Sequence, residues 1–178
     1  QATIAKTLDR RQMVRLVSHM ASDERVDLLK AVPQEIQNAL LPALAQAERE
    51  DIRRLARYEE GTAGAIMTSE YATLQPELTA SEAIEKLRRE APDKETIYYA
   101  YVVDEKRRLQ GFVSLKDLIL SPPDRRVEQI AHRDAIFARV DEDQEDAANK
   151  IATYDLLALP VVNGNDVLVG IVTHDDAL

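Results

Sequence analysis

The chain has 178 residues, of which 45% are apolar and 31% are charged, a balance typical of a globular protein of one or two domains. It contains no apolar run of about 18 residues that could span a membrane, no signal-peptide pattern at its start, and no cysteine, which excludes disulfides and thiolate metal sites. Nearly all of its net charge of −9 falls in residues 127–178, where eleven acids and three bases give −8, a field that attracts cations and disfavours nucleic acid as a partner.

The first part of the chain is predicted to be helical, because its apolar residues keep roughly helical spacing. Ser22 is placed to cap one helix, and Pro33 starts another that Pro42 ends. We therefore expect a small all-α domain over residues 1–57, shortened relative to its complete form. A linker over residues 58–66 holds the first two glycines of the chain and marks the domain boundary.

The rest of the chain is a repeat. Residues 111–117 read G-F-V-S-L-K-D, and residues 170–176 read G-I-V-T-H-D-D. In each copy, the motif overlaps the second of two short apolar strands joined by a polar turn, and a helix precedes the strands. A β-β-α unit with one exposed sheet face is poorly buried alone, so we expect the copies, 67–126 and 127–178, to face each other as a pseudo-twofold pair. The predicted fold class is α+β.

Four strands are predicted within the pair, over residues 98–103, 109–113, 159–162 and 167–172. The first of them carries the largest aromatic cluster of the chain, Tyr98, Tyr99 and Tyr101. We expect Tyr99 to point opposite to Tyr98 and Tyr101, and two of the three side chains to pack in the core or in a dimer interface.

The Gly-x-x-[Ser/Thr]-x-x-[Asp/Asn] ending, present twice in register, resembles that of tandem CBS domains, the Bateman module. Three segments are similar to sequences of the MgtE magnesium transporters: Y-E-E-G-T-A-G-A-I-M-T at 58–68, A-P-D-K-E-T-I-Y-Y-A-Y-V-V-D-E at 91–105 and L-P-V-V at 159–162. The resemblance covers essentially the whole chain. It implies the cytosolic region of such a transporter, in which a helical N domain and two CBS domains precede a transmembrane pore.

The resemblance also implies how this region is used. We expect a homodimer formed through the CBS domains, located at the cytoplasmic face of the cell membrane, with the transporter's own transmembrane domain as a partner. An enzyme is not expected. The three histidines are scattered, and the chain has no HExxH, GxSxG or GxxxxGK[ST] motif.

Magnesium ligands are expected among the acids, since Mg²⁺ prefers oxygen ligands and often uses only one or two carboxylates. In the second copy, Glu145 lies near the start of a predicted helix, while Ala152 and Asp155 lie near its end, where carbonyls are unpaired and the helix dipole is negative. The resemblance implies ligands at the following positions, with Ala152 and Ala65 contributing backbone carbonyls: Asp23, Asp27, Ala65, Glu145, Ala152, Asp155, Asp175 and Asp176.

Each of these acids also has a purely structural interpretation, as a helix-capping or first-turn acid, and the charge as a whole could serve only solubility. The favoured hypothesis is that, with little Mg²⁺ bound, the acids of the N domain and of the second CBS copy repel one another. Bound Mg²⁺ then bridges them, closes the assembly and gates the pore.

A nucleotide is the second expected ligand. The best candidates for its contacts are Thr96, Tyr99, Ser114, Lys116 and Asp117. The resemblance implies ATP as the ligand, with Tyr99 and Asp117 at positions that match the family's contact residues. Two positions depart from the family pattern: residue 156, aromatic in the family, is Leu156, and residue 134, basic in members that bind ATP, is Asp134. The structural alternative is that Ser114 caps a helix and Asp117 is its first-turn acid. An ATP-responsive CBS module with a dimerisation role, or a pure dimerisation scaffold, remains the alternative function.

Overall fold

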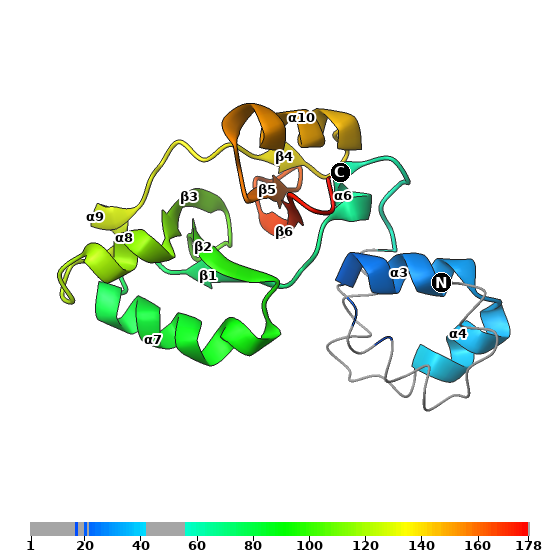
Figure 1. Cartoon of the computed structure of the whole chain (residues 1–178), viewed down its shortest axis with the longest axis horizontal. Helices are drawn as coiled ribbons and strands as arrows, with labels where there is room; N and C mark the ends of the chain where they lie inside the picture. The colour runs from blue at the N-terminus through cyan, green and yellow to red at the C-terminus, as the bar shows by residue number, and fades with distance from the viewer. Residues whose placement is uncertain (1–16, 18–19, 21, 42–55, 178) are drawn as a thin grey trace.

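The computed structural model describes residues 17, 20, 22–41 and 56–177 (Figure 1). The helices are α3 (Ser22–Ala31), α4 (Gln34–Leu40), α6 (Ala63–Ile66), α7 (Ala80–Glu90), the 3₁₀ helix η2 (Ala91–Asp93), α8 (Leu115–Leu120), α9 (Val127–Ile130) and α10 (Gln144–Tyr154). The strands are β1 (Tyr71–Leu74), β2 (Thr96–Val103), β3 (Leu109–Ser114), β4 (Ala138–Arg139), β5 (Ala158–Val162) and β6 (Leu168–Thr173). Within the described part of the chain, none of the helices has the length and apolar character of a membrane span.

The amino-terminal helices lie beside the second copy of the repeat. Helix α3 begins at Ser22 itself, and Pro33 occupies the N-cap of α4 with φ −56°. Val26, Leu29 and Val32 of this region share one apolar cluster with β5 and β6. The helices that the sequence predicts before residue 17 and over 42–55 lie outside the described residues.

The repeat forms two three-stranded sheets of the same topology. In each sheet the middle strand pairs in parallel with the strand before it and antiparallel with the strand after it, in the orders β1-β2-β3 and β4-β5-β6. Helices α7 and α8 cover the first sheet, and α10 covers the second (Figure 1). The predicted α+β class, with its tandem β-β-α repeats, is confirmed.

The two copies meet through their hairpin turns. The backbone N–H of Leu109 donates to the carbonyl of Asp166 at 3.1 Å, and the N–H of Leu168 donates to the carbonyl of Arg107 at 3.0 Å. Arg107 and Asp166 are equivalent turn residues, and both have left-handed backbones, with φ of 62° and 61°. A buried cluster that includes Tyr101 joins the two sheets behind these turns. The two copies thus pack against each other as one unit.

The segment before β1 packs on the second sheet. Ala63 and Gly64 donate backbone hydrogen bonds to the carbonyls of Glu142 and Val140, at 2.8 and 2.9 Å. Thr68 exchanges hydrogen bonds with Ile171 of β6. The region expected to be a linker therefore belongs structurally to the second copy, and it holds α6 beside α10.

The expectation about Tyr99 is wrong. Side chains on a strand alternate with a period of two, so Tyr99 and Tyr101 share a face and Tyr98 takes the other. Tyr99 and Tyr101 line the same small cavity, whereas Tyr98 is 65% exposed.

Candidate functional site

The carboxyl end of α10 offers the oxygen atoms that the sequence predicts. The backbone N–H groups of Asp155 and Leu156 both donate to the carbonyl of Ile151, so the N–H that would ordinarily reach the Ala152 carbonyl is used elsewhere. Asp155 caps the helix with φ 51° and is exposed. A free carbonyl and a carboxylate therefore lie together at the negative end of a helix dipole, an arrangement that suits a hard cation.

Glu145 lies at the other end of the same helix. It is an exposed first-turn acid, and its backbone N–H donates to Asp143, the N-cap residue, at 2.7 Å. Asp155 lies ten positions after Glu145, about 15 Å along the helix at the standard rise. These two acids therefore cannot bind the same ion within one copy of this chain.

Asp27 and Ala65 are brought together, although 38 positions separate them in the sequence. Both line a cavity of about 400 Å³ between α3, α6 and the start of α10, together with Lys30, Glu60 and Gln144. Helix α6 ends one residue after Ala65, so the Ala65 carbonyl belongs to a last turn that lacks helical partners. Partial burial raises the pKa of Asp27; Lys30 lowers it and Glu60 raises it further. Asp23 lies in α3, but its side chain is outside the described ones.

Asp175 and Asp176 lie in a group of acids drawn from three parts of the chain. Burial raises the pKa of Glu95, and the charges of Asp176, Glu70, Glu24 and Asp175 raise it further. Asp176 also accepts a 2.6 Å hydrogen bond from the Thr173 hydroxyl, within its own repeat motif. Glu24 of α3, Glu70 and Glu95 of the first copy and Asp176 of the second copy thus repel one another. We call this boundary between α3 and the two copies the acidic seam.

One cation at this seam was missed by the sequence analysis. Arg25 of α3 is 4% exposed, and its Nη2 donates to the Glu70 carboxylate at 2.6 Å, while its Nε donates to the Met20 carbonyl at 3.0 Å. The pair ties α3 to the residue that precedes β1. A buried arginine in a charged helix has no signal of its own in the sequence.

The acids remain too dispersed to form a closed protein cage. Within the part of the chain that the structure describes, no three His, Cys, Asp or Glu side chains lie close enough to hold one metal ion. Mg²⁺ does not require such a cage, because it retains several water ligands and is often held by one or two carboxylates. The carbonyl–carboxylate pairs around Asp155 and Asp27 fit this preference.

The predicted nucleotide residues of the first copy gather at the start of α8. Ser114 caps this helix and forms a capping box with Asp117: the Ser114 Oγ accepts from the Asp117 N–H at 3.0 Å, and the Ser114 N–H donates to Asp117 Oδ2 at 3.1 Å. The structural alternative for these two residues is therefore present. Asp117 Oδ1 is not used in the capping box or in the His132 contact and could still meet a ligand.

His132 adds a contact that the sequence did not predict. Its Nε2 lies 2.8 Å from Asp117 Oδ2, and its ring stacks on Phe112 with centroids 4.9 Å apart. Phe112 in turn makes an edge contact with Tyr99, with centroids 5.6 Å apart. A continuous aromatic wall therefore leads from Tyr99 to the Asp117 carboxylate.

A small cavity of about 40 Å³ lies behind this wall, between the two copies. Tyr99, Phe112 and Leu156 line it, and so does Tyr101, whose buried hydroxyl has no hydrogen-bond partner among the described residues. Burial and the neighbouring Tyr99 raise the pKa of Tyr101. Leu156 thus occupies the wall where the family pattern places an aromatic ring. Thr96 begins β2, and Lys116 is exposed on α8.

Comparison with known proteins was made by family and by structure. The model of the MgtE intracellular N domain matches residues 1–61, and the CBS domain model matches residues 63–123 and 127–178. The magnesium transporter MgtE of Thermus thermophilus is 46% identical over 159 residues, which is 88% of this chain and 35% of that protein. The MgtE of Bacillus subtilis is 35% identical over 162 residues, covering 91% and 36% of the two. The chain thus spans about a third of the length of these curated relatives.

Two solved structures match along almost the whole chain. The cytosolic domain of the Mg²⁺ channel MgtE in complex with ATP has a TM-score of 0.95 at 44% identity, covering 99% of this chain and 72% of that one. The soluble part of a magnesium transporter has a TM-score of 0.91 at 38% identity, covering 97% and 68%.

Proposed function

The chain belongs to the MgtE magnesium transporter family, as an intracellular N domain followed by two CBS domains, and from this premise we propose that it is the Mg²⁺-sensing regulatory region of a magnesium transporter. Its relatives are transporters with CBS regulatory domains, in agreement with the prediction that it is not an enzyme. In this proposal it acts at the cytoplasmic face of the membrane and controls a transmembrane pore.

The observation that carries the proposal is the acidic seam between α3 and the CBS pair. Asp27 faces Glu60 and Ala65, while Glu24 lies among Glu70, Glu95 and Asp176. The raised pKa values of Asp27 and Glu95 mean that closing this seam disfavours the charged carboxylates. A divalent cation relieves that cost without protonation, so its binding favours the closed arrangement of N domain and CBS pair.

The geometry supports two of the proposed ligand pairs. Asp27 with the Ala65 carbonyl would hold one ion between the N domain and the CBS pair, with water completing its shell. Asp155 with the Ala152 carbonyl would hold another at the end of α10. Glu145, Asp175, Asp176 and Asp23 are proposed as further ligands, alone or with residues of a second subunit.

Dimerisation through the CBS pair is part of the proposal. Tyr98 and Leu157 occupy equivalent positions of the two copies, since Tyr99 pairs with Ser114 as Ala158 pairs with Thr173. Both are more than half exposed, as are Ile119, Leu120 and Tyr154. Exposed apolar residues of this kind along the edge of the pair suit a symmetric interface with a second copy.

A second candidate function is an ATP-responsive module. It is supported by the aromatic wall beside Asp117 and by the relative whose cytosolic domain was solved with ATP. Thr96, Tyr99, Ser114, Lys116 and Asp117 would form the site. Leu156 and the exposed Asp134 weigh against tight binding, since one removes a stacking surface and the other repels phosphate.

Thermal unfolding of the chain distinguishes the two functions, because a ligand that binds only the folded state raises Tm. At a concentration about 100 times its Kd, a ligand adds about 2.7 kcal/mol. We expect millimolar Mg²⁺ to raise Tm by several degrees, and Asp27→Asn and Asp155→Asn each to reduce the increase. A rise with ATP and none with Mg²⁺ would favour the second function and contradict the first.

A further inference from the structure

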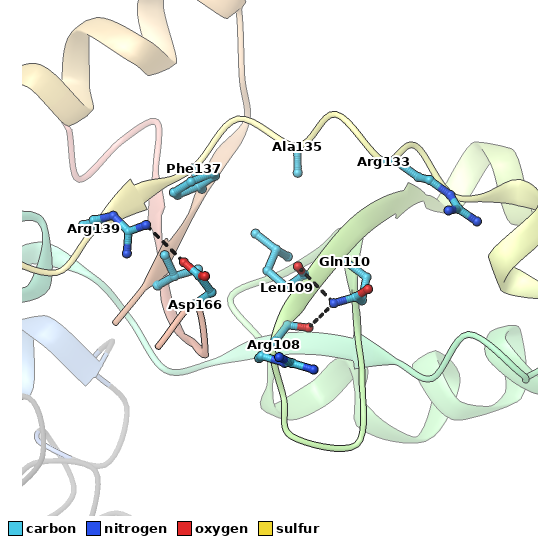
Figure 2. A pocket seen from close by; sticks show the side chains of 9 residues that line it. Arg108, Leu109, Gln110, Arg133, Ala135, Phe137, Arg139 and Asp166 are labelled. Carbon is cyan, nitrogen blue, oxygen red and sulfur yellow. Dashed lines mark hydrogen bonds and ion pairs between the residues drawn. The ribbon is translucent and has the colours of Figure 1, made fainter. Parts of the chain in front are cut away.

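A cleft of about 580 Å³ is lined by none of the residues proposed above to bind Mg²⁺ or a nucleotide. Figure 2 shows it beneath the segment that joins the two copies, with Arg133 and Arg139 at its two ends and Leu109, Gln110 and Arg108 of the first copy on the opposite side.

The cleft is positive on a negative molecule. Residues 127–178 contain only three bases, and two of them, Arg133 and Arg139, line this cleft with Arg108 from the first copy. The one acid in the lining, Asp166, already accepts a 3.1 Å hydrogen bond from Arg139. Arg108 is likewise paired, with Asp104 at 2.8 Å, so an anion entering the cleft meets uncompensated charge from Arg133, although the chain as a whole carries −9.

Several donors of the cleft are unused. Arg133 makes no hydrogen bond or ion pair with any residue that the structure describes, and it is exposed. The Arg108 Nε donates to Asp104 at 2.8 Å, which leaves the two terminal nitrogens of Arg108 available to a ligand. The Gln110 amide reaches only two backbone carbonyls, each at the long distance of 3.5 Å. The Gln110 amide, whose contacts are weak, and the Arg133 guanidinium can therefore both turn toward a ligand.

The frame around these donors is fixed. The hydrogen bonds between the two hairpin turns hold Arg108 and Asp166 in place from below. Arg139 is held at three points: by the Asn163 carbonyl at 3.2 Å, by Asp166, and by the Phe137 ring 5.7 Å beneath its guanidinium. Less side-chain entropy is then lost when a ligand contacts Arg139 than when it contacts a freely moving surface arginine.

We infer that this cleft binds an anion carrying two or more phosphate groups, with Arg133, Arg108 and Gln110 donating to its oxygens and Arg139 closing the far end. Guanidinium forks match phosphate oxygens two at a time, and charges spread along a cleft of this size call for more than one phosphate. A soluble polyphosphate and the headgroups of an anionic membrane present the same chemistry. The inference does not depend on Mg²⁺ sensing.

Calorimetric titration of the chain with sodium tripolyphosphate, in Mg²⁺-free buffer of low ionic strength, tests the inference. We expect saturable binding that weakens about tenfold in Arg133→Gln and in Arg108→Gln, the loss of one charge-assisted contact. Arg89→Gln removes an equal charge from an exposed position on α7 and serves as the matched control. Thermal unfolding confirms that each variant is folded.

Vesicles of phosphatidylcholine, with and without phosphatidylglycerol, form the second arm. Binding to the acidic vesicles that is lost in Arg133→Gln, without tripolyphosphate binding, assigns the cleft to the membrane. Three results overturn the inference: no binding in either arm, an equal loss in Arg89→Gln, or a loss in Lys116→Gln with none in Arg133→Gln.

Discussion

The glycine of the repeated motif is required in both copies because another segment of the chain packs directly against it. A Cβ atom on Gly111 would lie 2.3 Å from the His132 carbonyl oxygen, and one on Gly170 would lie 2.4 Å from the Met67 sulfur. The segment that enters each copy therefore crosses directly over the motif glycine of the copy beside it. The sequence predicted the repeat from these glycines, but not which segment lies against them, because that contact joins positions far apart in the chain.

We expect Gly111→Ala to destabilise the chain by about 3 kcal/mol and Gly170→Ala by about 1 to 2 kcal/mol. The first methyl group meets backbone that cannot give way, whereas the second chiefly meets a flexible methionine side chain. Gly164→Ala is the control, since nothing lies within 4 Å of its added carbon. Urea unfolding measures all three, and equal losses for Gly111 and Gly164 would contradict the argument.

Asp117 gives a prediction on pH. Burial alone would raise its pKa, but hydrogen bonds from Ser114 and from His132 outweigh burial, and the pKa lies below its ordinary value of 3.8. A depressed folded pKa contributes stability above pH 3.8 that is lost as the pH falls through the folded pKa. Asp117→Asn should therefore cost about 1 kcal/mol at pH 7 and progressively less in acid. Urea unfolding across this range checks it, with exposed Glu128→Gln as control; a cost independent of pH would contradict it.

At the scale of elements, the sequence predicted more of the fold than of the sites. The four predicted strands lie within a residue or two of β2, β3, β5 and β6, because apolar runs bounded by turn residues depend on local sequence. The sites depend on which elements meet. Asp27 and Ala65 were named through family resemblance, and only the packing of α3 against α6 places them at one cavity. No local sequence pattern predicts the contact of Arg25 with Glu70 or that of His132 with Asp117.

The pair between Arg25 and Glu70 fastens α3 to the CBS pair. Arg25→Met removes the cation paired with Glu70 and leaves Glu70 facing Glu95 and Asp176. We expect a loss of about 2 kcal/mol and a higher Mg²⁺ concentration for half-maximal thermal stabilisation. Glu70→Gln should show a smaller stability loss, because the Gln amide oxygen can still accept the Arg25 hydrogen bond, and a lower Mg²⁺ requirement. A lower requirement in Arg25→Met would contradict this role.

At the scale of the whole molecule, two copies of one β-β-α unit bury each other and leave apolar residues exposed at their edges, among them Tyr98, Leu157 and Leu120. If those edges join two subunits, Leu120→Asp should weaken dimerisation by about tenfold or more. Phe137→Asp, an exposed aromatic outside these edges, is the matched control. Sedimentation velocity over a range of concentrations measures the dimer, and an unchanged dimer in Leu120→Asp would remove these edges from the interface.

The central claim is that Mg²⁺ closes the acidic seam between the N domain and the CBS pair. Small-angle X-ray scattering during a Mg²⁺ titration tests it most directly. The radius of gyration should fall as Mg²⁺ rises to tens of millimolar, and Asp27→Asn should shift the fall to higher Mg²⁺. Exposed Glu128→Gln is the control, since α9 lies at the other end of the molecule from α3 (Figure 1). A radius of gyration that stays constant over this range in the unaltered chain would contradict the account.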